Sequence, residues 1–182
     1  MKKYYFIIFF VSAFTNSSAS LNESIIQNLQ NITNVSFEFE QNINEKIEKG
    51  NCTIQYPNKI YCNYDSIKDK ILVSNGKSLV VKTKKSYNLY PLSKTPLIYI
   101  LDKDFLINKI KNLEKRVIDD KFINFNFIEN DNEINIFFNK ENNNLVGWQT
   151  LDMYQNLSIT YISILTINQK LDKSMFYLPS QN

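Results

Sequence analysis

The stretch Lys70-Ile-Leu-Val-Ser-Asn-Gly-Lys-Ser-Leu-Val-Val81 carries the clearest turn signal in the chain. An Asn-Gly pair between two apolar runs favours a tight hairpin turn, because both residues tolerate the positive φ that such a turn needs. Residues 69–75 and 78–84 are therefore predicted to form two antiparallel strands joined at Asn75-Gly76.

Strand-like segments continue from this hairpin towards the N-terminus. Two of them, 51–57 and 60–65, are separated by the turn-forming pair Pro57-Asn58. A third begins at Val35, where apolar residues take every second position through Phe39. This alternation is typical of a strand with one buried face.

Three segments predict short helices. Residues 21–32 carry four apolar side chains at helical spacing, which gives one apolar stripe. The segment Thr95-Pro-Leu-Ile-Tyr-Ile-Leu101 has its proline where a first helical turn tolerates it, and Thr95 is a suitable cap. Residues 102–112 are expected to continue as another helix.

Strands resume in the second half of the chain, near 115–119, 121–128, 132–138, 145–153 and 156–168. In the last of these, Leu157, Ile159 and Tyr161 occupy one phase of the alternation. Ile162 and Ile164 occupy the other phase. This change predicts a bulge or a sharp bend.

These elements predict a mainly β (α+β) fold of about ten or eleven antiparallel strands with short helices. A long meander must close or be covered, because its edges and its apolar face are unstable in water. We therefore expect a strongly curved, incompletely closed β-barrel with the helices on its concave side. Periodicity leaves two interiors open, a solid core and a ligand cavity.

The first 19 residues have the features of a removable export signal. Two early lysines precede a short apolar run that ends near Phe14, and Ser17-Ser18-Ala19 supplies small residues for cleavage. The run is shorter than the roughly 20 residues that span a bilayer. We expect cleavage after Ala19, a single domain over 20–182 and a periplasmic location if the source is bacterial. Asn156-Leu-Ser158, an acceptor triplet for glycosylation, leaves a eukaryotic secreted protein as the alternative.

The charge balance and the absence of histidine exclude several functions. Of 21 basic and 18 acidic residues, two lysines belong to the expected signal, so the remainder is nearly neutral. A nucleic-acid-binding protein would need a concentrated basic face. Without histidine there is no Ser-His-Asp or Cys-His catalysis and no histidine-containing zinc site. No nucleic acid, metal or cofactor is expected.

Cys52 and Cys62 are the only cysteines. A turn at Pro57-Asn58 would place them on adjacent strands, where facing residues have Cα atoms about 5.5 Å apart, within reach of a disulfide. An oxidising compartment favours the bond, and two buried free thiols are the alternative.

Short motifs along the chain resemble those of the LolA family, the periplasmic carriers of outer-membrane lipoproteins. In order they are Phe39-Glu-Gln41, Gly50-Asn-Cys-Thr-Ile-Gln-Tyr-Pro-Asn58, Ile71-Leu-Val-Ser-Asn-Gly-Lys77, Thr95-Pro-Leu97, Leu145-Val-Gly-Trp-Gln-Thr-Leu-Asp152 and Phe176-Tyr-Leu-Pro179. The motifs are collinear with those of the family and cover nearly all of the chain after the expected signal.

The resemblance implies an unclosed barrel whose helices form a lid over an apolar cavity, and a function in transport without catalysis. Its implied partners are triacylated lipoproteins, an inner-membrane ABC transporter that releases them, and an outer-membrane acceptor. The carrier itself would be a monomer.

Candidate cavity residues follow from strand phase and family position. They are Phe37, Phe39, Ile54, Ile60, Leu72, Leu79, Val81, Leu97, Leu101 and Trp148. Each could equally be ordinary core, because a sheet buries such side chains whether or not it binds lipid. Tyr56 and Pro57 are the candidate lid contacts. In the family an arginine before this proline holds the lid backbone, and a phenol offers one donor and no charge in its place.

Two other function classes compete with a carrier. An envelope sensor of the same fold that binds lipid or lipoprotein and regulates a partner is the main alternative. An esterase acting on envelope lipid is disfavoured, because the chain has neither a histidine nor a Gly-x-Ser-x-Gly motif.

Overall fold

A single curved sheet organises the protein in the computed structural model, which describes residues 20–65, 68–151 and 155–181. The helices are α1 (Leu21–Asn31), α2 (Ile98–Leu101) and α3 (Lys103–Asn112), with 3-10 turns η1 (Leu92–Lys94) and η2 (Lys173–Phe176). The strands are β1 (Asn34–Ile43), β2 (Lys46–Gln55), β3 (Lys59–Tyr64), β4 (Ile71–Asn75), β5 (Ser78–Lys82), β6 (Tyr87–Pro91), β7 (Arg116–Ile118), β8 (Phe122–Glu129), β9 (Asn132–Asn139), β10 (Leu145–Leu151) and β11 (Leu157–Ile167). The expected signal peptide, residues 1–19, lies outside the described residues.

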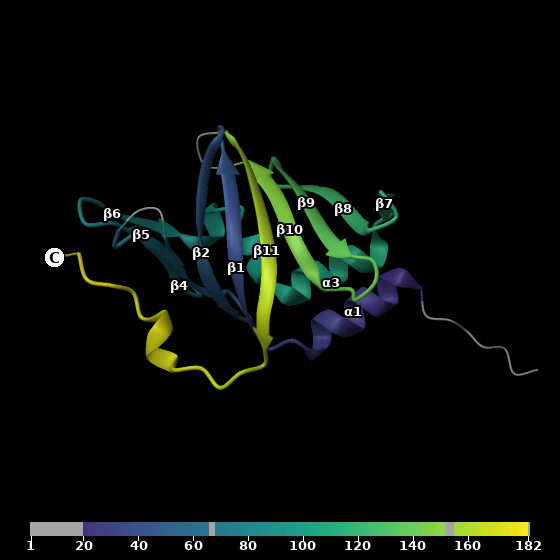
Figure 1. The fold of residues 1–182 in the computed structure, drawn as a ribbon, viewed down its shortest axis with the longest axis horizontal. Helices are drawn as coiled ribbons and strands as arrows, with labels where there is room; N and C mark the ends of the chain where they lie inside the picture. Colours follow the sequence, from purple (N-terminus) through teal and green to yellow (C-terminus); the bar gives the residue numbers. More distant parts are fainter. Residues whose placement is uncertain (1–19, 66–67, 152–154, 182) are drawn as a thin grey trace, which may run out of the picture.

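The strands follow the order β6-β5-β4-β3-β2-β1-β11-β10-β9-β8-β7, and all paired neighbours are antiparallel. The first and last strands therefore lie side by side at the centre of the sheet (Figure 1). Among the described strands, the edges β6 and β7 do not pair with each other, so the curved sheet stays open. The expected incompletely closed antiparallel barrel is confirmed.

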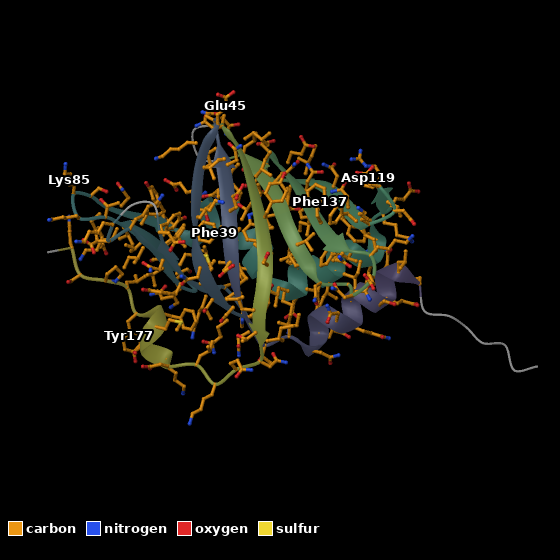
Figure 2. All side chains as sticks on the ribbon, in the orientation of Figure 1. Phe39, Glu45, Lys85, Asp119, Phe137 and Tyr177 are labelled. Carbon is orange, nitrogen blue, oxygen red and sulfur yellow. A yellow bond between two sulfur atoms is a disulfide. The ribbon has the colours of Figure 1, made fainter. Side chains whose placement is uncertain are left out.

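Tight turns with two left-handed residues join several strands. Asn44–Glu45, Asp119–Asp120 and Asn130–Asp131 all have positive φ at both positions, and Figure 2 shows Glu45 and Asp119 at strand ends. Such turns match the right-handed twist of the strands that they connect. The predicted hairpin at Asn75-Gly76 also forms, but with positive φ at Gly76 alone (+99°), and the side chain of Asn75 accepts from the amides of Lys77 and Ser78.

The structure differs from the sequence prediction at one strand boundary, one missed strand and one helix cap. β2 begins at Lys46 rather than at 51, and its charged first half pairs with β1. β6, Tyr87–Pro91, was not expected; its proline is tolerated because an edge strand needs fewer ladder donors. Thr95 does not cap α2, because its hydroxyl donates instead to the Leu92 carbonyl and the helix begins at Ile98.

The last strand contains a bulge, but not where the change of phase between Tyr161 and Ile162 predicts one. Ser36 pairs with Thr166 and Phe37 with Ile164, so the extra residue is Leu165. The side chains of Leu157 and Tyr161 are about half exposed, at 51% and 58%. The apolar phase at the start of β11 thus faces outwards.

Helices α1 and α3 fill the concave side of one half of the sheet, next to β8–β10 (Figure 1). Their buried residues are Ile25, Ile26 and Leu29 of α1 and Leu106, Ile107 and Ile110 of α3. They pack with Phe125 and Phe138, whose rings meet edge to face. Helix α1 begins with a capping box formed by Ser20 and Glu23. Across the described ranges, no helix is both long and apolar enough to cross a membrane.

Polar contacts join the helices to each other and to the sheet. The Asn22 side chain donates to the carbonyl oxygen of Ile110 at 2.9 Å, which joins α1 to α3. Lys109 forms an ion pair with Glu129 at 2.6 Å, at the end of β8. This half of the barrel therefore has the solid interior that was one of the two alternatives.

Candidate functional site

The other half of the concave side contains a partly open cavity of about 450 Å³. This volume lies within the range of roughly 300–1,000 Å³ that is usual for ligand pockets. Its walls come from β1–β5, β6, β10 and β11, and Thr95, Pro96 and Leu97 cover it from the segment that leads into α2. The fold thus combines both predicted interiors, a solid core under α1 and α3 and a cavity beside it.

Eight of the ten candidate residues line the cavity, namely Phe37, Phe39, Ile60, Leu72, Leu79, Val81, Leu97 and Trp148, and together they are called the apolar wall. Ile54 and Leu101 do not line it, because both are fully buried in the core. Ile54 lies just before the β2–β3 turn, and Leu101 accepts a hydrogen bond from that turn, so the wall is solid there. That the eight residues bind a ligand stays a prediction.

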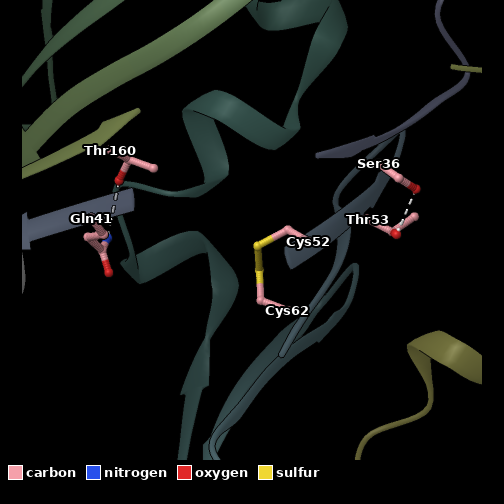
Figure 3. Close-up of a disulfide and its surroundings, with 6 residues drawn as sticks. All are labelled: Ser36, Gln41, Cys52, Thr53, Cys62 and Thr160. Atoms are coloured by element: carbon pink, nitrogen blue, oxygen red, sulfur yellow. Dashed lines mark hydrogen bonds between the residues drawn. A yellow bond between two sulfur atoms is a disulfide. The ribbon is translucent and has the colours of Figure 1, made fainter. Parts of the chain in front are cut away.

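Aromatic rings and a disulfide shape the apolar wall. Trp148, the only tryptophan, meets Phe37 edge to face with ring centroids 6.4 Å apart. Cys52 and Cys62 face each other on β2 and β3, with Cα atoms 4.1 Å apart, and form a disulfide (Figure 3). Both residues line the cavity.

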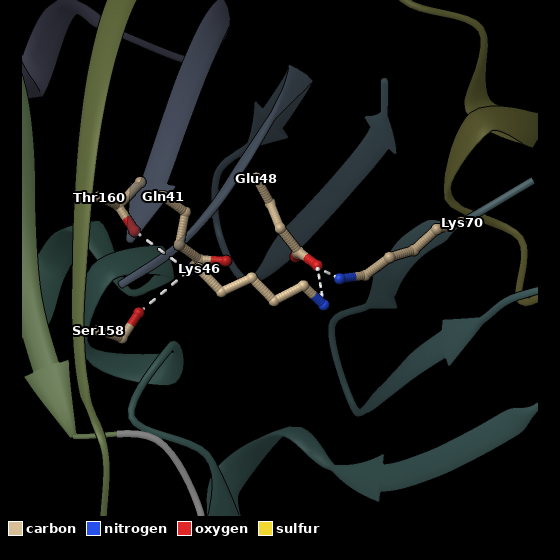
Figure 4. Close-up of polar contacts among 6 residues, drawn as sticks. All are labelled: Gln41, Lys46, Glu48, Lys70, Ser158 and Thr160. Atoms are coloured by element: carbon tan, nitrogen blue, oxygen red, sulfur yellow. Dashed lines mark hydrogen bonds and ion pairs between the residues drawn. The ribbon is translucent and has the colours of Figure 1, made fainter. Parts of the chain in front are cut away.

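A second set of lining residues is polar. Gln41, Glu48, Lys70, Thr150, Ser158 and Thr160 all line the cavity and are called the polar patch. Gln41 of β1 lies at the centre of the patch, because it pairs with Glu48 of β2 on one side and with Thr160 of β11 on the other. Its Nε2 donates to the hydroxyl oxygens of Ser158 and Thr160 at 3.1 and 3.2 Å (Figure 4). Sequence reasoning missed this set. The sequence signal that could have identified it is the recurrence of polar residues at alternate positions of a strand, as at Ser158 and Thr160.

An ion pair forms one side of the polar patch. The carboxylate of Glu48, 7% exposed, is bonded to the ammonium of Lys70, and the more exposed Lys46 approaches it at 3.2 Å (Figure 4). Burial opposes the ionisation of Glu48, but the hydrogen bonds and charges of the two lysines outweigh it and lower the Glu48 pKa. Lys70 also lies over the ring of Tyr64, 4.0 Å from the centroid. Burial, helped by the negative charge of Glu48, raises the pKa of Tyr64.

The predicted lid contacts Tyr56 and Pro57 lie beside a main-chain bond that Asn58 makes to α2. The amide of Asn58 donates to the carbonyl oxygen of Leu101 at 2.9 Å. The phenol of Tyr56 makes no hydrogen bond within the described ranges, and the ammonium of Lys103 lies 5.8 Å from its ring centroid. Burial raises the pKa of Tyr56 to about 12. A latch function for Tyr56 stays a prediction.

The cavity therefore offers apolar surface, hydroxyl groups and one ion pair. In the part of the chain that the structure describes, no group of three or more cysteine, histidine or carboxylate side chains is placed to hold a metal ion. Such a lining can hold an amphiphilic molecule, with its apolar part against the rings and its polar part against the polar patch.

A family comparison gives the broadest match. The model described as "Outer membrane lipoprotein carrier protein LolA" matches residues 30–179, which is most of the chain. No functionally curated protein matches the sequence significantly.

Several solved structures are similar at low sequence identity. A LolA superfamily protein from Nitrosomonas europaea is 10% identical with a TM-score of 0.43, and the match covers 88% of this chain and 99% of that one. The lipoprotein LppX from Mycobacterium tuberculosis is 13% identical with a TM-score of 0.44, covering 84% and 97%. LprF from Mycobacterium bovis is 11% identical with a TM-score of 0.43, covering 82% and 94%. These values are too low to support an argument about function.

Proposed function

Because the chain belongs to the LolA family of outer membrane lipoprotein carrier proteins, we propose that it carries lipoproteins by enclosing their acyl chains in the cavity. The observation that supports this proposal is the apolar wall, eight apolar side chains that line one cavity open on one side. The transfer is non-enzymatic, and the residues named here bind and shield rather than react.

The physical need for a carrier is large. Each methylene exposed to water costs about 0.8 kcal/mol, so an acyl chain with about 15 methylenes costs roughly 12 kcal/mol. A cavity lined by Phe37, Phe39 and Trp148 removes that surface from water. At about 450 Å³ the cavity is near the lower end of the usual range for one ligand, about 300–1,000 Å³. Loading of several acyl chains therefore requires the covering residues Thr95, Pro96 and Leu97 to move outwards.

The proposal extends to the compartment and the partners. The protein would work in the periplasm as a monomer after removal of residues 1–19. It would receive triacylated lipoproteins from an inner-membrane ABC transporter and pass them to the outer membrane or to an acceptor there. ATP hydrolysis by the transporter would supply the free energy, so the carrier itself needs only to bind and release.

A direct test uses Trp148 as the reporter, because it is the only tryptophan and lies in the apolar wall. A lipid with brominated acyl chains should quench Trp148 fluorescence in purified residues 20–182, whereas the unbrominated lipid should not. Leu97→Asn should weaken quenching, because it places an amide at the cavity. Leu89→Asn, at a 56% exposed position outside the lining, is the matched control. Absence of quenching in the wild-type chain would contradict the proposal.

The transport step needs its own assay. Inner-membrane vesicles that hold the transporter and a labelled triacyl lipoprotein are incubated with ATP and the purified chain. Soluble one-to-one complexes of chain and lipoprotein are expected. Label that stays with the vesicles, from a chain that binds brominated lipid, would exclude the carrier role while leaving lipid binding intact.

A further inference from the structure

The polar patch has hydrogen-bonding capacity that the protein does not use. Ser158 and Thr160 each accept from Gln41, so each hydroxyl still has a proton to donate. The Thr150 hydroxyl makes no hydrogen bond with any other residue in the described ranges, although Thr150 is only 9% exposed. All three side chains line the cavity.

These groups are neighbours on the inner face of adjoining strands. Thr150 of β10 pairs with Ser158 of β11, and Thr160 of β11 pairs with Gln41 of β1. Three hydroxyl donors therefore lie together at one end of the cavity. Trp148 of β10 is next to them, since it pairs with Thr160 of β11. Ser158 and Thr160 accept from Gln41 and keep their protons, and the Thr150 hydroxyl has no partner among the described residues, so the lining offers donors to a ligand that accepts hydrogen bonds.

The local charge restricts what that ligand can be. The ammonium of Lys70 is neutralised by Glu48, which is itself buried. Lys46, the other lysine at this carboxylate, has a side chain that is 69% exposed. The inner part of the polar patch thus has no net charge, and a buried anion there would lack a counter-charge.

We propose that the polar patch binds the uncharged carbonyl region of an acylated ligand, the ester or amide groups that link acyl chains to their head. The hydroxyls of Thr150, Ser158 and Thr160 donate to these carbonyl oxygens, and the acyl chains extend along the apolar wall. This assignment rests on the proposed function and adds to it the orientation of the ligand and the chemistry of its linkage. It predicts that the cavity binds ester- or amide-linked acyl groups more tightly than free fatty acids or plain hydrocarbons.

The test compares three ligands with chains of equal length. Residues 20–182 are first quenched with 1-bromododecane, which reports on the apolar wall through Trp148. Monolauroylglycerol, laurate and dodecane then compete for the cavity. Monolauroylglycerol should displace the probe at least about fivefold more effectively than dodecane, the effect of one net hydrogen bond. Laurate should gain no advantage from its charge.

Isosteric variants locate the effect. Thr150→Val and Thr160→Val should each lower the affinity for monolauroylglycerol about fivefold and leave the affinity for dodecane unchanged. Thr166→Val on β11, at an exposed position outside the lining, is the control and should change neither. Thermal unfolding confirms that each variant is folded, and Ser158→Ala provides a second removal of a hydroxyl.

The outcomes separate the two proposals. Equal competition by monolauroylglycerol and dodecane, or no effect of the three hydroxyl variants, would overturn the assignment of the polar patch while lipid binding stands. Preference for laurate would replace it with a site for anions. Failure of 1-bromododecane to quench Trp148 would overturn the proposed function, and this inference with it.

Discussion

The amide of Asn58 is hydrogen-bonded to the carbonyl oxygen of Leu101 at 2.9 Å, which joins the β2–β3 turn to the end of α2. Both groups belong to the main chain, so the contact does not depend on a particular side chain in the turn. Tyr56 stands where resemblance to the family leads us to expect an arginine, and this main-chain bond joins the two segments whichever side chain stands at that position. Leu101 is fully buried, which adds apolar packing at the same point.

Leu97 and Leu101 should therefore respond differently to truncation. Leu101→Ala leaves a hole in the solid core and is expected to destabilise the protein by about 2–5 kcal/mol. Leu97→Ala should be much milder, because Leu97 is partly exposed and faces the cavity, but it should weaken the binding of acyl chains. Urea unfolding and Trp148 quenching measure the two effects. Similar losses of stability in both variants would contradict the division between core and cavity.

The pair of Glu48 and Lys70 predicts a dependence on acid. Because the lysines hold the Glu48 pKa below its ordinary value of 4.5, its stabilisation is present above about pH 4.5 and is lost as the pH falls through the lowered pKa. Glu48→Gln should destabilise the protein at pH 7 by about 1–3 kcal/mol, since it leaves the ammonium of Lys70 without its charged partner. It should also flatten the change in stability between pH 6 and pH 3.

A double variant is the control for this pair. Glu48→Gln combined with Lys70→Met removes both charges and should recover part of the stability lost by Glu48→Gln alone. Chemical unfolding of all three proteins at several pH values gives the comparison. If the single and double variants were equally unstable, the pair would not be the source of the effect.

The disulfide between Cys52 and Cys62 closes a short loop, with a sequence separation of 10. On the loop-entropy estimate, its removal should cost about 2–3 kcal/mol. The double variant Cys52→Ala, Cys62→Ala should therefore unfold at lower urea concentration than the oxidised wild-type chain. Adding a reductant should lower the stability of the wild-type chain but leave that of the variant unchanged.

Gly147 lies where β10 and β11 approach closely. A Cβ atom built at this position would be 2.3 Å from the carbonyl oxygen of Thr160, so a strand would have to shift. Gly147→Ala is expected to destabilise the protein by about 1–3 kcal/mol and to displace Thr160 from the polar patch. Ser163→Ala, at an exposed position of β11, is the matched control and should stay near wild-type stability.

Strand patterns predicted most of the fold because apolar alternation and turn residues act locally. The Asn75-Gly76 hairpin and the strand that begins near Val35 were both found this way. β6 was missed, since Pro91 argues against a strand unless that strand is already known to be at an edge. Whether a strand lies at an edge depends on the order of the whole sheet, so the five residues of β6 cannot predict it.

The site was harder to predict because its polar part contradicts the usual rule for buried faces. At the start of β11 the apolar residues Leu157 and Tyr161 face outwards, and Ser158 and Thr160 face the cavity. The usual rule places the apolar set of alternating residues on the buried face of the strand. Only the register with β1, which places Thr160 opposite Gln41, reverses that assignment.

The pairing of β1 with β11 in the middle of the sheet joins the two ends of the described chain. Strands β1–β6 can form a meander early, but the edge of β1 that pairs with β11 has no partner until the last strand is available. Contacts between such distant segments form slowly, and a bare strand edge is a template for pairing with other molecules. Truncation before β11 should therefore leave two unjoined meanders with bare edges at β1 and β10, which aggregate rather than form a smaller stable domain.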